Sequence, residues 1–93
     1  MAKPFRLIFI VTVMKSRGEV YLVLKAAQDI MAQGGAVFVV GLPEITAWVE
    51  LHGLKTMSLS LKKEENHNNL KLLQQEFQPT GVIYASYRNL FSG

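Results

Sequence analysis

The chain of 93 residues contains no cysteine. This absence excludes a disulfide framework, a thiolate zinc site, an iron–sulfur cluster and a cysteine nucleophile. Charged residues are also sparse, at 18% of the chain, and the net charge of +3 is small. Such a charge is compatible with a small anionic ligand but gives no reason to expect nucleic-acid binding.

Long apolar runs are missing as well. The most apolar stretch extends only from Leu7 to Met14, whereas a membrane span needs roughly twenty residues. Lys15, Ser16 and Arg17 follow it directly, without the small-residue cleavage site of a secretory signal. We therefore expect no membrane span and a cytoplasmic protein.

Apolar residues nevertheless make up 49% of the chain, which favours one packed domain over residues 1–93. Continuous β-branched and aromatic runs predict strands at 7–13, 36–40 and 82–85, and an alternating run predicts a strand at 55–61. Helices are predicted from Glu19 to the Gly34–Gly35 pair, from Glu44 to Gly53, and within residues 62–78. The predicted core faces of these helices comprise Val20, Val23, Leu24, Ala27, Ile30 and Met31, then Ile45, Trp48, Val49 and His52, then Leu70, Leu73 and Phe77.

The order of these elements is β-α-β-α-β-α-β. Strict alternation favours a parallel sheet with right-handed crossovers, and so a small Rossmann-like or flavodoxin-like three-layer α/β domain with four strands. The alternative is a ferredoxin-like βαββαβ sandwich, which requires residues 44–53 to be a mere connection. Alternation in residues 55–61 indicates that this strand is less enclosed and lies at an edge of the sheet.

In a parallel sheet, ligands bind beyond the carboxyl ends of the strands. The predicted loops there contain basic or small residues suited to an anionic ligand: Lys15, Ser16, Arg17, Gly18, Lys62 and Arg88. The dinucleotide fingerprint, the phosphate loop and the serine-hydrolase elbow are all absent from the sequence. We therefore expect no cofactor. The alternative interpretation of the basic residues is that they bind no ligand and are polar only because loops lie at the surface.

Neither histidine has recognisable metal-ligand spacing. His52 is expected to be a core or half-buried side chain, and no metal site is predicted. His67 lies in the polar stretch from Lys62 to Asn69, which is typical of a solvated helix start, with Asn66 or a neighbour as its cap.

Three short pieces of residues 16–54 together resemble a known family. They are Ser16-Arg17-Gly18-Glu19-Val20, Ala32-Gln33-Gly34-Gly35-Ala36-Val37, and Pro43-Glu44 followed by Val49, Gly53 and Leu54. These pieces resemble the N-terminal half-domain of GT-B glycosyltransferases of the sterol- and antibiotic-glycosyltransferase type. The resemblance implies a Rossmann-like half-domain whose first turn lies near the hydroxyl of the acceptor.

This sequence departs from the family pattern at two positions of the first turn. Lys15 stands where the family has glycine, and Glu19 stands where it has aspartate. If the family role is carried over, Glu19 is the candidate catalytic base. The nucleotide-sugar donor of such enzymes is held mainly by a C-terminal domain that is absent from this sequence. This chain alone is therefore not expected to catalyse sugar transfer.

Aromatic and apolar residues gather near the end of the sequence, where Tyr87, Leu90 and Phe91 follow Tyr84. Such a cluster indicates a protein partner or a homo-oligomer, although these residues are equally able to fold back over the sheet. Two functional hypotheses remain open. The first is a non-catalytic binding or regulatory module that acts through a protein partner or an anionic ligand, and the second is the acceptor-binding half of a two-chain GT-B glycosyltransferase.

Overall fold

A computed structural model describes residues 5–12 and 17–86 of the chain. Along these ranges strands and helices alternate: β1 (Arg6–Val11), α1 (Arg17–Ala32), β2 (Ala36–Gly41), α2 (Pro43–Glu50), β3 (Lys55–Ser58), α3 (Lys63–Phe77) and β4 (Gly81–Ser86). The predicted order of elements is confirmed. The ferredoxin-like alternative is wrong, because residues 43–50 form a helix and every strand pairing is parallel.

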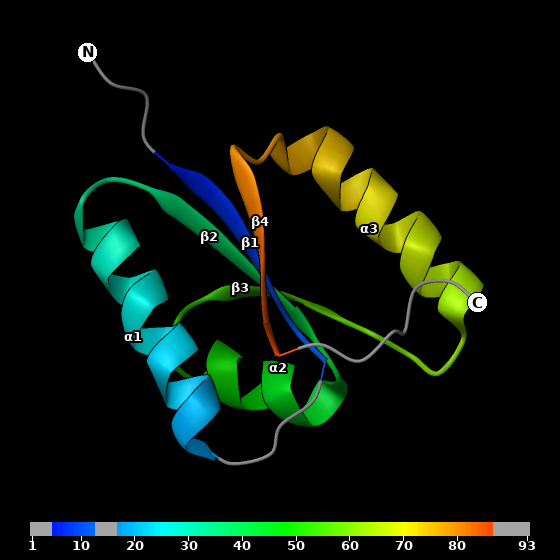
Figure 1. The fold of residues 1–93 in the computed structure, drawn as a ribbon, viewed down its shortest axis with the longest axis horizontal. Coiled ribbons are helices and arrows are strands. Elements are labelled where there is room, and N and C mark those ends of the chain that lie inside the picture. Colours follow the sequence, from blue (N-terminus) through cyan, green and yellow to red (C-terminus); the bar gives the residue numbers. More distant parts are fainter. Residues whose placement is uncertain (1–4, 13–16, 87–93) are drawn as a thin grey trace.

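The described strands form one four-stranded sheet with the order β3-β2-β1-β4. This is the order in which a Rossmann sheet begins, so the predicted Rossmann-like α/β class is confirmed. Figure 1 shows α1 and α2 together on one side of the sheet and α3 on the other. Strand β3 lies at an edge of the sheet, as its alternating sequence predicts.

Both faces of the central strands are buried, which explains why these strands are continuous apolar runs rather than alternating ones. On the face covered by α1 and α2, which we call the α1/α2 face, Phe9, Val11, Val37 and Val39 contribute to one apolar cluster. The opposite face, the α3 face, is formed by Ile8, Ile10 and Val40 together with Leu59, Leu73 and Phe77. Successive residues of a strand point to opposite faces, so one short run serves two cores.

The helix boundaries follow from local chemistry. Gly34 adopts a φ of +88°, the left-handed conformation that glycine takes without strain. The N–H groups of Gly34 and Gly35 donate to the carbonyls of Met31 and Ile30, which closes the last turn of α1. Pro43 occupies the first turn of α2, where its missing N–H costs no hydrogen bond. These three positions behave as predicted.

Three side chains differ from the predicted pattern. Met31 is exposed although it lies inside α1, directly after Ile30, which still packs against the core of the α1/α2 face. His52 is exposed, not buried, because α2 ends at Glu50. Leu61 is 82% exposed because β3 ends at Ser58, so the strand alternation no longer places its side chain in the sheet.

Among the described residues, no helix is both long and apolar enough to cross a membrane. Helix α1 has 16 residues and α3 has 15. The longer of the two carries a full solvent-facing side, on which Lys25, Gln28 and Asp29 are exposed. Such a helix is amphipathic, as a helix lying on a sheet requires.

Candidate functional site

The carboxyl edge of the sheet gathers the starts of all the described helices. Because the strands are parallel, their carboxyl ends meet at one edge, and each helix begins there. The order β3-β2-β1-β4 reverses between β1 and β4. In doubly wound folds, ligands bind in the crevice at such a point of reversal. The candidate functional site is therefore the carboxyl edge near the ends of β1 and β4.

The first turn of α1 follows β1 and begins at Arg17, with Gly18 and Glu19 next in the helix. Lys15 and Ser16 lie outside the described residues, and so do the side chains of Arg17 and Glu19. Gly18 is exposed. The first N–H groups of a helix have no partner within the helix, and its dipole is positive at this end. The backbone of this turn is thus suited to an anion.

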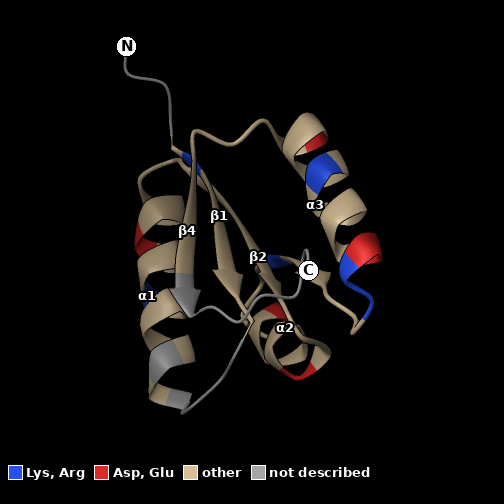
Figure 2. Ribbon diagram, turned by 45° about the vertical axis from the view of Figure 1, so that its right-hand side comes forward, with Lys and Arg blue, Asp and Glu red and all other residues tan. Residues whose placement is uncertain are grey.

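Lys62 lies at the same edge but across the sheet from α1. It is the residue directly before α3, and its side chain is 77% exposed. Its Nζ lies 3.8 Å from the Oε1 of Glu65, and Figure 2 shows basic and acidic residues side by side at this end of α3. In Figure 1 the starts of α1 and α3 lie far apart. A small ligand at the first turn of α1 would therefore have no contact with Lys62.

The remaining predicted site residues lie in the last part of the chain. Arg88, a predicted ligand-binding residue, lies outside the described residues. Tyr87, Leu90 and Phe91, the predicted partner-binding residues, lie outside them as well. In the sequence, Tyr87 is the first residue after β4, which ends at Ser86 next to β1.

Asn66 is the buried polar residue that organises the loop between β3 and α3. Its Oδ1 accepts a hydrogen bond from the N–H of Ser60 at 2.9 Å, and its Nδ2 donates to the carbonyl of Ser60 at 2.8 Å. The predicted role of Asn66 as helix cap is wrong, because the capping position is Lys62 and Asn66 lies inside α3. The side-chain amide of Asn66 instead forms two hydrogen bonds with the backbone of one loop residue, accepting one and donating the other.

Hydrogen bonds and close packing also join the elements around the start of α2. The hydroxyls of Thr46 and Ser58 are hydrogen-bonded at 2.7 Å, and Thr46 also donates to the carbonyl of Pro43 at 3.3 Å. A Cβ added to Gly41 would lie 2.5 Å from the carbonyl oxygen of Val11, closer than van der Waals contact permits. Glycine at this position therefore lets β1 and β2 approach each other at the carboxyl edge.

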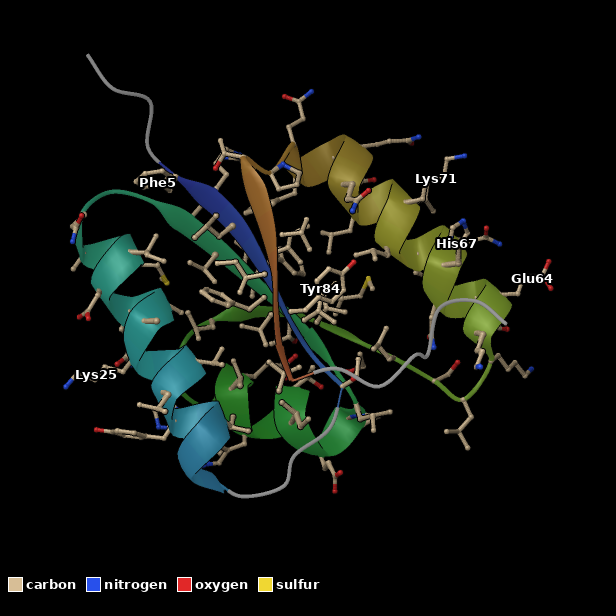
Figure 3. All side chains as sticks on the ribbon, viewed as in Figure 1. Phe5, Lys25, Glu64, His67, Lys71 and Tyr84 are labelled. Carbon is tan, nitrogen blue, oxygen red and sulfur yellow. The ribbon has the colours of Figure 1, made fainter. Side chains whose placement is uncertain are left out.

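Among the described residues, neither histidine lies in a cluster of potential metal ligands. The ring of His52 lies 5.0 Å from that of Trp48, and its Nδ1 is hydrogen-bonded to the carbonyl of Trp48. Figure 3 shows Glu64, His67 and Lys71 pointing away from the sheet along α3. Within the part of the chain that the structure describes, no group of three potential ligands could hold a metal ion.

The sequence did not predict two polar contacts at this edge: the hydrogen bond between Thr46 and Ser58, and the hydrogen bonds between Asn66 and Ser60. Thr46 and Asn66 are polar residues in helices, and both are buried. The sequence signal was weak, because each partner lies six or twelve residues away on another element. A buried polar side chain needs such a partner, but only the fold reveals which one it meets.

Comparison with known proteins adds no further constraint on the site. No protein-family model, curated protein or solved structure matches this chain.

Proposed function

We propose that this chain is a binding or regulatory module with no catalysis of its own, which takes an anionic ligand at the carboxyl edge of its sheet. The observation that carries the proposal is the reversal of strand order between β1 and β4, next to the start of α1. Ligands of doubly wound folds bind at this point. The first turn of α1 contains N–H groups that have no partner within the helix, and Arg17 adds a positively charged residue to the same turn.

The ligand class follows from charge. The chain has a net charge of +3, and the positive end of the α1 dipole adds to the attraction for an anion. The absence of a glycine-rich phosphate loop from the sequence argues against a nucleoside triphosphate held by many backbone contacts. A single phosphate, sulfate or carboxylate group is the size of anion that one helix start can hold.

The test is a calorimetric titration of the whole chain with inorganic phosphate. Replacing Arg17 with alanine is expected to weaken binding about tenfold, because hydrogen bonds to charged groups contribute roughly 1.5–3 kcal/mol. Lys25→Ala is the matched control, since it removes the same charge from an exposed position two turns further along α1. Equal weakening in both variants would mean that only net charge matters and would overturn the site.

The second candidate function is the acceptor-binding half of a two-chain GT-B glycosyltransferase. It is favoured by one specific observation: the pieces that resemble the family coincide with the matching structural elements. Arg17, Gly18 and Glu19 open α1, Gly34 closes it, and Pro43 opens α2. These coincidences support the Rossmann-like half-domain that the resemblance implies, while the activity itself rests on the resemblance.

The glycosyltransferase proposal is tested by affinity capture of the tagged chain and transfer assays on the captured complex with nucleotide sugars. In such a complex Glu19→Gln is expected to abolish transfer, because it removes the candidate base. Glu44→Gln is the matched control, as Glu44 occupies the first turn of α2 instead. Full transfer activity with Glu19→Gln would exclude the catalytic role of Glu19. A binding module, by contrast, would be nearly unaffected by this change.

A further inference from the structure

The two edges of the sheet differ in length and charge. Edge strand β3 has four residues and begins with Lys55, and the hydroxyl of Thr56 is engaged by the carboxylate of Glu50. Edge strand β4 has six residues, Gly81–Ser86, and none is charged. Short strands and charges are the devices that keep sheet edges from pairing with other chains. In the described part of the chain, β4 has neither.

The backbone of β4 shows which groups face outward. The N–H of Thr80 donates to the carbonyl of Arg6 at 2.7 Å, so Thr80 directs its backbone groups toward β1. In a parallel pair, successive residues of a strand direct their backbone N–H and C=O groups to opposite sides. The backbone groups of Val82 and Tyr84 therefore also point toward β1. Gly81 and Ile83 then direct their N–H and C=O groups away from the sheet, where no strand of the described ranges pairs with them.

Two described side chains of β4, Ile83 and Tyr84, are exposed, and they lie on opposite faces of the sheet. Ile83 is level with Phe9 of β1, so its side chain lies on the α1/α2 face, where it is 41% exposed. Tyr84 is level with Ile10 on the α3 face and is 56% exposed; Figure 3 shows its position on β4. Apolar side chains beside an outward-facing backbone are what a further strand needs in order to pair and pack.

We propose that β4 pairs with β4 of a second copy of this chain, antiparallel about a twofold axis at Ile83. In this register Ile83 faces its own counterpart, Val82 faces Tyr84, and Gly81 faces Ala85. A twofold axis brings each strand against itself, so a charge at its centre would meet a like charge. The uncharged sequence of β4 avoids that conflict, whereas Lys55 begins the other edge strand. The result is a continuous sheet of two copies.

The dimer goes beyond the proposed anion site and does not depend on it. Titration with phosphate examines the start of α1, whereas self-association examines the outer side of β4. A negative phosphate titration would not contradict the dimer, and a monomeric chain would not contradict the anion site. A single strand pair buries a modest area, so the dimer is expected to dissociate on dilution rather than to be permanent.

The first test is sedimentation equilibrium of the whole chain over a wide range of concentration. The expected mass rises from 10.4 kDa toward twice that value. Ile83→Lys is expected to weaken association more than about tenfold, because two like charges would face each other across the axis. Leu51→Lys is the matched control: it places the same charge on an exposed leucine just after α2, away from β4, and leaves association unchanged.

The second test is cross-linking, which the absence of native cysteine makes clean. Directly opposite residues of a hydrogen-bonded antiparallel pair have Cα atoms about 5.5 Å apart, within the range of a disulfide. Ile83→Cys is expected to form a disulfide dimer under mild oxidation at least about tenfold faster than Leu51→Cys. A monomer at every concentration, a dimer that survives Ile83→Lys, or equal cross-linking of the two cysteine variants would each overturn the proposal. Circular dichroism of each variant verifies that it is folded.

Discussion

On the α1/α2 face, two helices cover the sheet with a continuous apolar layer, whereas on the α3 face one largely polar helix covers it. Among the described residues, the first cluster contains eleven buried side chains and the second contains six. The first seven residues of α3, Lys63–Asn69, include no apolar side chain. Apolar packing can therefore hold only the second half of α3, through Leu70, Leu73 and Phe77.

Polar contacts hold the two ends of α3. At its start, Asn66 binds the backbone of Ser60. At its end, the Nε of Arg6 donates to the carbonyl of Phe77 at 2.8 Å, and the guanidinium lies 4.5 Å from the centre of the Phe77 ring. A helix with a short apolar face is thus positioned by a few directed contacts in addition to burial.

The largest effect on the free energy of unfolding is expected from truncating a buried leucine, one on each face of the sheet. Leu24→Ala and Leu73→Ala should each lower the free energy of unfolding by about 2–5 kcal/mol. Leu24 belongs to the larger cluster, so we expect the greater loss there. Urea denaturation measures both, with Leu72→Ala as the control because Leu72 is exposed on α3. A greater loss at Leu73 would contradict the comparison.

The next effect concerns the start of α3. Asn66→Ala leaves the N–H and carbonyl of Ser60 without their side-chain partners, which should cost about 1–3 kcal/mol of unfolding free energy. Asn69→Ala, an exposed asparagine in the same helix, should change it little. Hydrogen exchange of the Ser60 amide offers a local readout, since its protection should fall in the first variant only. Equal stability of the two variants would mean that the start of α3 is held in some other way.

A smaller effect is expected at the other end of α3. Arg6→Ala removes both the hydrogen bond to the Phe77 carbonyl and the cation–π contact, at an expected cost of about 1–2 kcal/mol. Arg6→Lys keeps the charge but loses the Nε donor, so it should recover part of this loss. Thermal unfolding followed by circular dichroism separates the two variants. Full recovery with lysine would show that a positively charged donor is sufficient and that the geometry of the guanidinium adds nothing.

The smallest effect is expected from the ion pair between Lys62 and Glu65. Both side chains are largely exposed, and exposed pairs contribute little because water and salt screen them. Lys62→Ala should therefore change the free energy of unfolding by less than about 0.5 kcal/mol. Chemical denaturation at low and high salt measures this difference. A loss as large as that of Asn66→Ala would show that charge, rather than the buried amide, fixes the start of α3.

The candidate site was only partly predictable from the sequence. The sequence predicts a helix after β1, because a strand run followed by helical periodicity is a local signal. Its start was predicted two residues too late: Arg17 and Gly18, which were expected in the loop, already belong to α1. The separation of Lys62 from the first turn of α1 was not predictable, because it depends on which face of the sheet each helix covers. The spacing of residues along the sequence does not show which face of the sheet a helix covers.

Local sequence signals were sufficient to predict the order of elements and most of the core. Strand runs, helical periodicity and end signals at Gly34 and Pro43 act between neighbouring residues, so they can be recognised without the fold. Local signals did not reveal the strand order, the exposure of Met31, His52 and Leu61, or the hydrogen bonds between Asn66 and Ser60. These depend on contacts between elements, and such contacts exist only once the chain has packed.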